Sequence, residues 1–199
     1  MLMCRCLLLI PLLLWASLGP AADSTAGLST ADREIAVWSD LINHGLDDHT
    51  KMIVLAELTS GDAAGLARDP ATIAEIIQQM KLPPSLFADW VRRNATTDLI
   101  ERPLKLAVSY QVLNAKTRAE LFDVSDPAAS WKLFFARFAG APGLLRVSHA
   151  GFDDALGHAV VYLEQVCGAD CGAGHLFHLT RDEHDHWVVQ DDVTVWMVK

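Results

Sequence analysis

The chain has 199 residues, 51% of them hydrophobic, and its 25 acidic against 16 basic residues give a formal net charge of −9. This acidic balance argues against nonspecific nucleic-acid binding, which depends on Lys and Arg neutralising phosphates, and against docking on anionic lipid. The length fits one domain of ordinary size that can bury a substantial core.

The first 21 residues follow the three-part order of a secretory signal peptide. A basic start at Arg5 precedes the apolar stretch Leu7–Trp15, which is followed by small residues up to Ala21. This order is typical of a cleavable leader. The stretch is too short to cross a bilayer, which takes about 20 apolar residues. We therefore expect cleavage near Ala21, a periplasmic or secreted location, and no membrane span in the mature chain. The alternative is an uncleaved membrane anchor.

Two cysteines, Cys167 and Cys171, remain once the leader with Cys4 and Cys6 is removed. In an oxidising compartment, thiols four residues apart in a Gly-rich turn are expected to form a disulfide. The alternative is a redox-active dithiol, which usually has C-x-x-C spacing at a helix start, where the helix lowers the thiol pKa. Here the spacing is C-x-x-x-C between predicted strands. The sequence therefore predicts a structural disulfide.

The segment after the leader divides into a tether and one domain. Residues 22–30 are small and polar and predict a flexible tether, whereas residues 31–199 predict a single globular domain. Ser29 or Thr30 is suited to cap a helix from Ala31 to about Asn43, in which apolar residues recur on one face.

The middle of the chain predicts a mixture of strands and helices. The apolar run Lys51–Thr59 predicts a buried strand. Helices are predicted to open at Asp69-Pro70 and to resume after the break at Pro83-Pro84. Strict alternation of apolar and polar residues predicts a strand over Leu104–Val112. A further helix is predicted to start at Asp126-Pro127.

The last third predicts a series of strands joined by Gly- and Asp-rich turns, the pattern of an antiparallel meander. The cysteines lie in the second connection, so the disulfide should fix one end of a hairpin. Helices followed by a meander indicate an α+β fold, in which N-terminal helices pack on one face of a mainly antiparallel sheet. The predicted strands are Leu144–Ala150, His158–Val166, His175–Arg181 and Trp187–Met197.

One polar cluster could suggest a metal site. On a strand, His175 and His178 point to opposite faces, and residues 182–186 fall in a turn, which is normally solvated. His184 and His186 could share a weak surface metal, but no third ligand is fixed. We therefore expect neither a metal nor another cofactor. The cluster comprises His175, His178, Asp182, Glu183, His184, Asp185 and His186.

No catalytic motif is evident. The chain has no G-x-S-x-G, and Ser148 and His149 are adjacent in a predicted strand, so they point opposite ways. Glu57 interrupts an apolar strand, and burial would raise its pKa as general acid chemistry requires. The preferred alternative is an edge strand with Glu57 facing water. A site assembled from distant residues, with strand histidines such as His158 or His175, remains open.

Two further features have ordinary explanations. Five tryptophans could line a ligand groove, but they lie on faces that the fold must bury. Asn94-Ala95-Thr96 fits the glycosylation triplet. The tryptophans are Trp38, Trp90, Trp131, Trp187 and Trp196.

Several short motifs resemble a group of small exported bacterial proteins of unknown function. The resemblance covers most of the mature chain and is sharpest over residues 148–196. It implies bacterial export and a strand-rich C-terminal half, and it transfers no catalytic residue. The motifs are Ser148-His149-Ala150-Gly151-Phe152, Ala159-Val160-Val161-Tyr162, Cys167-Gly168, Cys171-Gly172-Ala173-Gly174, Trp187-Val188-Val189 and Trp196.

Two functions remain after this reading. The first is a non-catalytic binding or interaction module for an envelope protein, a peptide or a small molecule. The second is a small periplasmic hydrolase with a dispersed acid/base site that uses Glu57 or a strand histidine. We favour the first, because no motif brings a nucleophile, a base and an orienting group together.

Overall fold

The computed structural model describes residues 28–61, 70–122, 125–153 and 155–198. The predicted leader and residues 22–27 of the predicted tether lie outside these ranges. The elements, in chain order, are α1 (Thr30–His44), β1 (Met52–Ala56), α2 (Pro70–Gln79), α3 (Pro84–Arg93), β2 (Ser109–Leu113), α4 (Ala115–Leu121), α5 (Pro127–Arg137), β3 (Leu144–Val147), β4 (Gly151–Phe152), β5 (His158–Gly168), β6 (Cys171–Arg181) and β7 (Trp187–Val198).

Helices begin where the sequence provides caps. The Ser29 hydroxyl accepts a hydrogen bond from the backbone N–H of Asp32 at 3.2 Å, so α1 starts at Thr30, one residue earlier than predicted. The Asp126 carboxylate accepts from the backbone N–H of Ala129 at 2.9 Å, and Pro127 occupies the first turn of α5.

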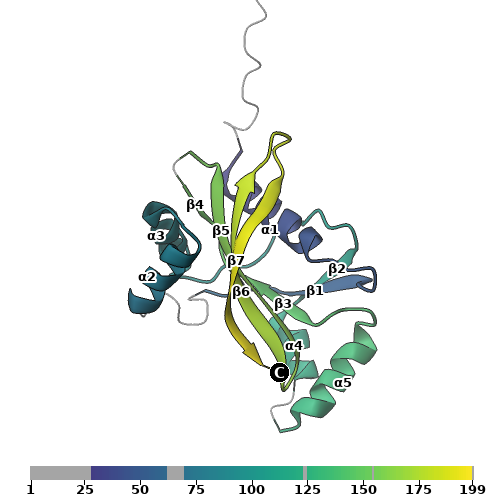
Figure 1. Cartoon of the computed structure of the whole chain (residues 1–199). Coiled ribbons are helices and arrows are strands. Elements are labelled where there is room, and N and C mark those ends of the chain that lie inside the picture. The colour runs from purple at the N-terminus through teal and green to yellow at the C-terminus, as the bar shows by residue number, and fades with distance from the viewer. Residues whose placement is uncertain (1–27, 62–69, 123–124, 154, 199) are drawn as a thin grey trace, which may run out of the picture.

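The strands form one mixed sheet in the order β2-β1-β3-β5-β6-β7, with β4 paired to β5. β1 is parallel to both β2 and β3, and the remaining pairs are antiparallel. β5, β6 and β7 form the C-terminal meander (Figure 1). The α+β class and the mainly antiparallel sheet with its meander are confirmed.

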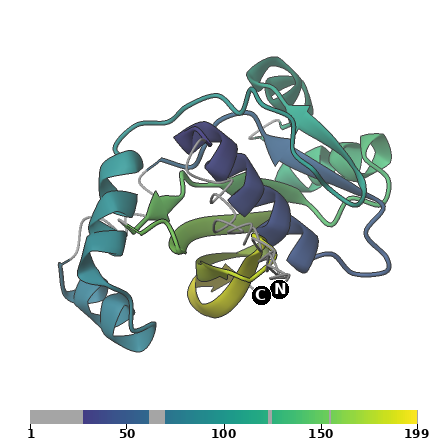
Figure 2. The same cartoon turned by 90° about the horizontal axis from the view of Figure 1, so that it is seen from above.

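Helices cover both faces of this sheet, so the expected single covered face is wrong. α1 packs on the face that carries Ile53, Leu55 and Val161, while alternate residues of the same strands face the other helices. On the opposite face, α2 and α3 cover β5 and β6, and α4 and α5 cover β1 and β3. Figures 1 and 2 show these two helix pairs at opposite ends of the molecule. Strands buried on both faces explain why β1 reads as a continuous apolar run.

The predicted strand Leu104–Val112 is wrong in extent, and its predicted buried side is right as far as Tyr110 but not at Val112, which is exposed. Leu104 is buried, but the first half of the segment is not paired. The backbone N–H of Lys105 donates to the Ser39 hydroxyl at 3.0 Å, and that of Ala107 donates to the Asn43 side chain at 2.8 Å. Side chains of α1 thus take the hydrogen bonds that a strand would have used.

Two other boundaries differ from the prediction. Leu144–Ala150 breaks after Val147, because the Asn94 side chain bonds the backbone N–H and C=O of His149. α4 has no counterpart among the predicted elements, since Leu121 is its one buried residue and no apolar stripe marks it.

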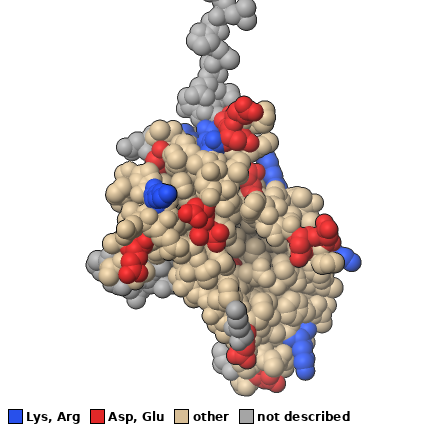
Figure 3. All heavy atoms as spheres, viewed as in Figure 1, with Lys and Arg blue, Asp and Glu red and all other residues tan. Residues whose placement is uncertain are grey.

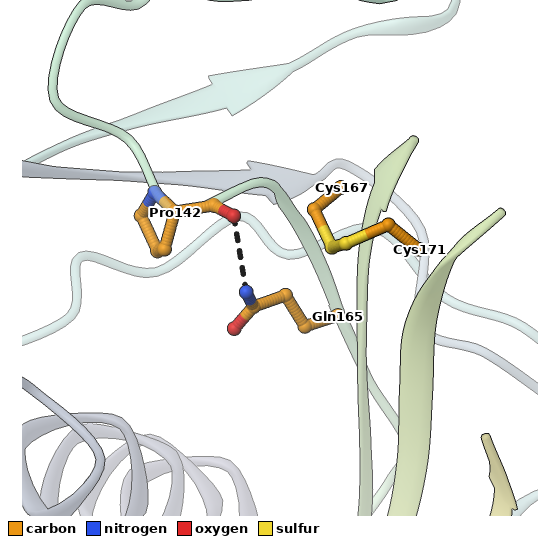
Figure 4. Close-up of a disulfide and its surroundings, with 4 residues drawn as sticks. All are labelled: Pro142, Gln165, Cys167 and Cys171. Carbon is orange, nitrogen blue, oxygen red and sulfur yellow. Dashed lines mark hydrogen bonds between the residues drawn. A yellow bond between two sulfur atoms is a disulfide. The ribbon is translucent and has the colours of Figure 1, made fainter. Parts of the chain in front are cut away.

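The cysteines form a disulfide that fixes the β5–β6 hairpin, as predicted. Cys167 lies near the end of β5 and Cys171 opens β6, with their Cα atoms 5.0 Å apart. Beside it, the Gln165 side chain donates to the Pro142 carbonyl at 3.0 Å and ties β5 to the loop before β3 (Figure 4). Within the described ranges, no helix has both the length and the apolar character needed to cross a bilayer.

Candidate functional site

Three parallel strands end at the same edge of the sheet. In the order β2-β1-β3, the chain leaves β1 towards β2 on one side and leaves β3 towards β5 on the other. Open α/β sheets place ligand sites outside the carboxyl ends of their strands, at such a switch point. The residues at this edge are Glu57–Ser60 after β1, Asn114 and Ala115 after β2, and Ser148–Ala150 after β3.

A pocket of about 140 Å³ opens at this edge, and we call it the carboxyl-end pocket. Its polar lining includes the hydroxyl-bearing residues Ser60 and Thr97 and the charged residues Glu57, Arg118 and Arg146. The pocket therefore offers hydrogen-bond donors of both neutral and charged kinds.

The charges in the pocket are unevenly compensated. Arg146 forms an ion pair with Glu164 at 2.9 Å. Glu57 is half-buried and accepts from the backbone N–H of Ala115 at 2.6 Å. Arg118 is exposed, and among the described residues it has no carboxylate partner. One guanidinium is thus left for a ligand.

Glu57 does not lie on an edge strand, which corrects the prediction. β1 is paired on both sides, and Glu57 follows its last residue. Its carboxylate bonds the backbone rather than another titratable side chain. The hydroxyl of Ser60 is buried, and in the described part of the chain it finds no hydrogen-bond partner. Buried polar groups are usually paired, so an unpaired one at a pocket indicates a place for a ligand or water.

A buried histidine lies beside the pocket, held between two carboxylates. The His149 Nδ1 lies 3.1 Å from a Glu34 oxygen, and its Nε2 lies 3.1 Å from an Asp98 oxygen. The Thr59 Oγ1 is 3.4 Å from the same Nε2 and accepts from the backbone N–H of Asp98 at 2.9 Å. Thr59 lines the carboxyl-end pocket and therefore joins the two groups of residues.

The electrostatics favour the protonated form of this histidine. Its hydrogen bond to Glu34 raises the pKa of His149 against the effect of burial, and the charges of Glu34 and Asp98 raise it further. Burial raises the pKa of Glu34, but the bond and charge of His149 and the charge of Arg93, 2.9 Å away, outweigh burial and lower it. Both ring nitrogens already face carboxylate oxygens, so neither is free to take a proton from a bound ligand.

The hydroxyl next in sequence is fully engaged. Ser148 is completely buried, and its Oγ accepts from Trp90 Nε1 at 3.0 Å and from the Tyr162 backbone N–H at 2.9 Å. It donates to the His149 carbonyl at 2.8 Å. Ser148 and His149 thus contact different neighbours and do not form a nucleophile–base pair.

The strand histidines are placed elsewhere in the sheet. The rings of His158 and His178 stack, with Nδ1 of the first 3.0 Å from Nε2 of the second. Burial, and then the charge of His158, lower the pKa of His178. His175 Nδ1 lies 3.1 Å from Asp192. None of these rings is bonded to Glu57 or His149, so the predicted candidates are not brought together into one site.

The histidines of the β6–β7 turn are exposed, as expected for a turn. His184 lies 3.6 Å from Glu183, and His186 lies 3.9 Å from Asp182. In the described segments, no cluster of three or more His, Cys, Asp or Glu side chains is arranged to hold a metal ion.

The tryptophans mostly serve the core. Trp38, Trp90 and Trp187 are buried, Trp196 donates from Nε1 to the Tyr162 hydroxyl at 2.6 Å, and Trp131 packs against phenylalanine rings.

Asn94 is also buried, which bears on the glycosylation triplet. Its side-chain nitrogen donates to the carbonyls of Trp90 and His149. That nitrogen is therefore not accessible to a sugar in the folded chain.

Sequence reasoning missed Glu34, Asp98, Arg118 and Arg146. Glu34 carried a signal, because it shares the spacing of the buried residues Val37, Trp38 and Leu41 on α1 and so interrupts an apolar stripe. The arginines are exposed or half-exposed and carry no such signal.

No protein-family model matches this chain, and no curated protein or solved structure is significantly similar to it. The geometry of the carboxyl-end edge is therefore the ground for a functional proposal.

Proposed function

We propose that this chain is an exported, non-catalytic binding module that holds a small molecule by a carboxylate or phosphate group in the carboxyl-end pocket. Export, to the periplasm or beyond, rests on the order of the leader and on the disulfide, since such bonds persist in oxidising compartments.

The observation that supports this function is an uncompensated guanidinium at a topological switch point. Arg118 lines the pocket, and within the described ranges it has no carboxylate partner. A guanidinium presents a planar fork of donors that matches carboxylate and phosphate oxygens. The unpaired Ser60 hydroxyl in the same lining offers a further hydrogen bond.

The size and charge of the carboxyl-end pocket restrict the class of ligand further. A pocket of about 140 Å³ accommodates one small group and leaves the rest of a ligand in solvent. Glu164 already pairs with Arg146, and the Glu57 carboxylate adds a negative charge to the lining. One oxyanion therefore suits the pocket better than a highly charged ligand.

The same edge argues against catalysis. Nucleophilic catalysis needs a hydroxyl or thiol within reach of a base that can accept its proton. Here the Ser148 hydroxyl already makes three hydrogen bonds, and both ring nitrogens of His149 already face the carboxylates of Glu34 and Asp98.

A hydrolase remains the second candidate because of one arrangement of side chains. Thr59 contacts His149, and His149 contacts Glu34, in the order of nucleophile, base and acid in a catalytic triad. It is the weaker candidate, since Asp98 competes for the same ring nitrogen and Thr59 is buried. Hydrolysis of p-nitrophenyl acetate by the wild type should not exceed that by His149→Gln. A large excess that depends on His149 would favour the hydrolase.

Titration with inorganic phosphate and with succinate, followed by chemical shifts of backbone amides, tests the binding function. We expect saturable shifts at residues around Ser60 and Arg118. Arg118→Gln should weaken binding by roughly tenfold or more, because a hydrogen bond to a charged group contributes about 1.5–3 kcal/mol. Arg137→Gln removes the same charge from an exposed position on α5 and serves as the control. Equal weakening by both variants, or no saturation with either anion, would refute the assignment.

Export is tested separately by intact mass. The protein recovered from a bacterial host should begin at Ala22 or Asp23. Retention of residues 1–21 would contradict cleavage without bearing on the pocket.

A further inference from the structure

The outer edge of β7 is a long strand edge to which no other strand is paired. β7 spans 12 residues and stands last in the strand order, so within the described ranges β6 is its one strand neighbour. Backbone groups on such an edge alternate between N–H and C=O and form a ready template for another extended chain.

Most of β7 is also open to solvent at its side chains. The α1 residue Asp40 reaches the beginning of the strand, where its carboxylate accepts from the backbone N–H of Trp187 at 2.8 Å. Beyond that point exposure is high, with Met197 52% and Val198 46% exposed. Isolated proteins usually protect a long edge with proline, lysine, β-bulges or a covering loop. The β7 sequence has neither proline nor lysine, and its two register shifts against β6, at Gln190 and Val195, leave Asp191–Thr194 as a regular stretch between them.

Charge is concentrated at the middle of the strand. Asp191 and Asp192 are the charged residues of β7, and they are consecutive. Successive strand residues point to opposite faces, so a carboxylate flanks the edge on each face. Asp192 lies beside His175, whereas Asp191 is opposite His178 in the register. Figure 3 shows a group of acidic side chains over the middle of the face along which β7 runs.

This charge disfavours pairing between two copies of the chain. An antiparallel self-pairing that matches the whole of β7 sets Asp191 opposite Thr194 and Asp192 opposite Val193. The four carboxylates would then lie within four consecutive cross-strand pairs, with Asp191 of each copy diagonal to Asp192 of the other on the same face. Diagonal neighbours on one face are close enough for like charges to repel each other, whereas a lysine or arginine in the added strand would be attracted.

We propose that the outer edge of β7 is an interaction surface that accepts an extended segment of another protein as an added strand, with lysine or arginine side chains beside Asp191 and Asp192. Backbone hydrogen bonds supply the attachment and the acidic pair selects the partner, as in other cases of strand addition. This surface lies at the opposite end of the strand order from β2 and does not depend on the carboxyl-end pocket.

A short synthetic peptide of alternating valine and lysine is the probe, and a peptide of equal length with glutamate in place of lysine is its control. The full chain is mixed with each peptide, and hydrogen exchange is measured amide by amide. We expect the lysine peptide to protect alternate amides of β7 and the glutamate peptide to leave them unchanged.

Charge variants separate the acidic pair from the net charge of the protein. Asp191→Asn with Asp192→Asn should weaken binding of the lysine peptide several-fold. Glu75→Gln with Glu120→Gln removes the same number of charges from the exposed surface of α2 and α4 and should not. The proposal is overturned if both peptides bind alike, if the protected amides lie outside β7, or if β7 becomes protected by rising concentration of the chain alone.

Discussion

Replacement of Ser148 by alanine tests whether its hydroxyl holds the segment between β3 and β4. The substitution leaves the indole N–H of Trp90 and the backbone N–H of Tyr162 without acceptors, and both residues are completely buried. Each buried donor that loses its partner costs about 1–3 kcal/mol. We therefore expect Ser148→Ala to reduce the free energy of unfolding by about 3 kcal/mol, which lowers the melting temperature by roughly 6–12 °C in a chain of this size.

Urea unfolding followed by circular dichroism measures the change, with Ser109→Ala as the control. Ser109 is exposed, and its loss should cost less than about 0.5 kcal/mol. Trp90→Phe combined with Ser148→Ala should cost less than the sum of the two, because both remove the same hydrogen bond. A loss below about 1 kcal/mol for Ser148→Ala, or strict additivity of the pair, would refute the reasoning.

The remaining predictions concern pH and the disulfide. In NMR titration the pKa of His149 should lie above its ordinary 6.5, and Glu34→Gln should lower it. The pKa of His149 is raised above 6.5 and that of Glu34 is lowered below 4.5, so their pairing should stabilise the fold fully between pH 4.5 and pH 6.5. The stabilisation should be lost as pH rises through the pKa of His149 or falls through that of Glu34. A flat profile of stability against pH that Glu34→Gln leaves unchanged would contradict this. Because the pKa of His178 is lowered, the unfolded chain binds the proton more readily than the folded chain, and this residue should reduce stability as pH falls below 6.5. His178→Gln should lessen that decline, which urea unfolding at several pH values measures. Replacing Cys167 and Cys171 by serine should cost about 2 kcal/mol by urea unfolding, and thiol titration of the native mature protein should detect no free cysteine.

Local signals in the sequence were sufficient for most elements of the fold. Asp126 followed by proline marked the start of α5, and Gly- and Asp-rich turns marked the strands of the β5–β6–β7 meander. The alternation over Leu104–Val112 identified the more buried side up to Tyr110, but it placed Val112 wrongly and did not reveal the pairing. Pairing there depends on Ser39 and Asn43 of α1, which are more than 60 residues away.

The candidate site was less accessible to sequence reasoning because it is built from distant segments. Glu34 and His149 meet across 115 residues, and no local pattern records that contact. The position of Glu57 was misjudged for a related reason. An apolar run does not say whether a strand lies at the edge or the centre of a sheet, since helices on both faces bury it in either case.

The disulfide has a consequence for how the chain matures. Cys167 and Cys171 are separated by four positions, so their sulfurs encounter one another in a disordered polypeptide without help from tertiary contacts. Oxidation can then precede folding. If the leader is removed as proposed, Cys4 and Cys6 leave with it. The two remaining thiols can then form only one intramolecular disulfide, so no incorrect pairing has to be rearranged. The protein would need an oxidant after translocation but no isomerase.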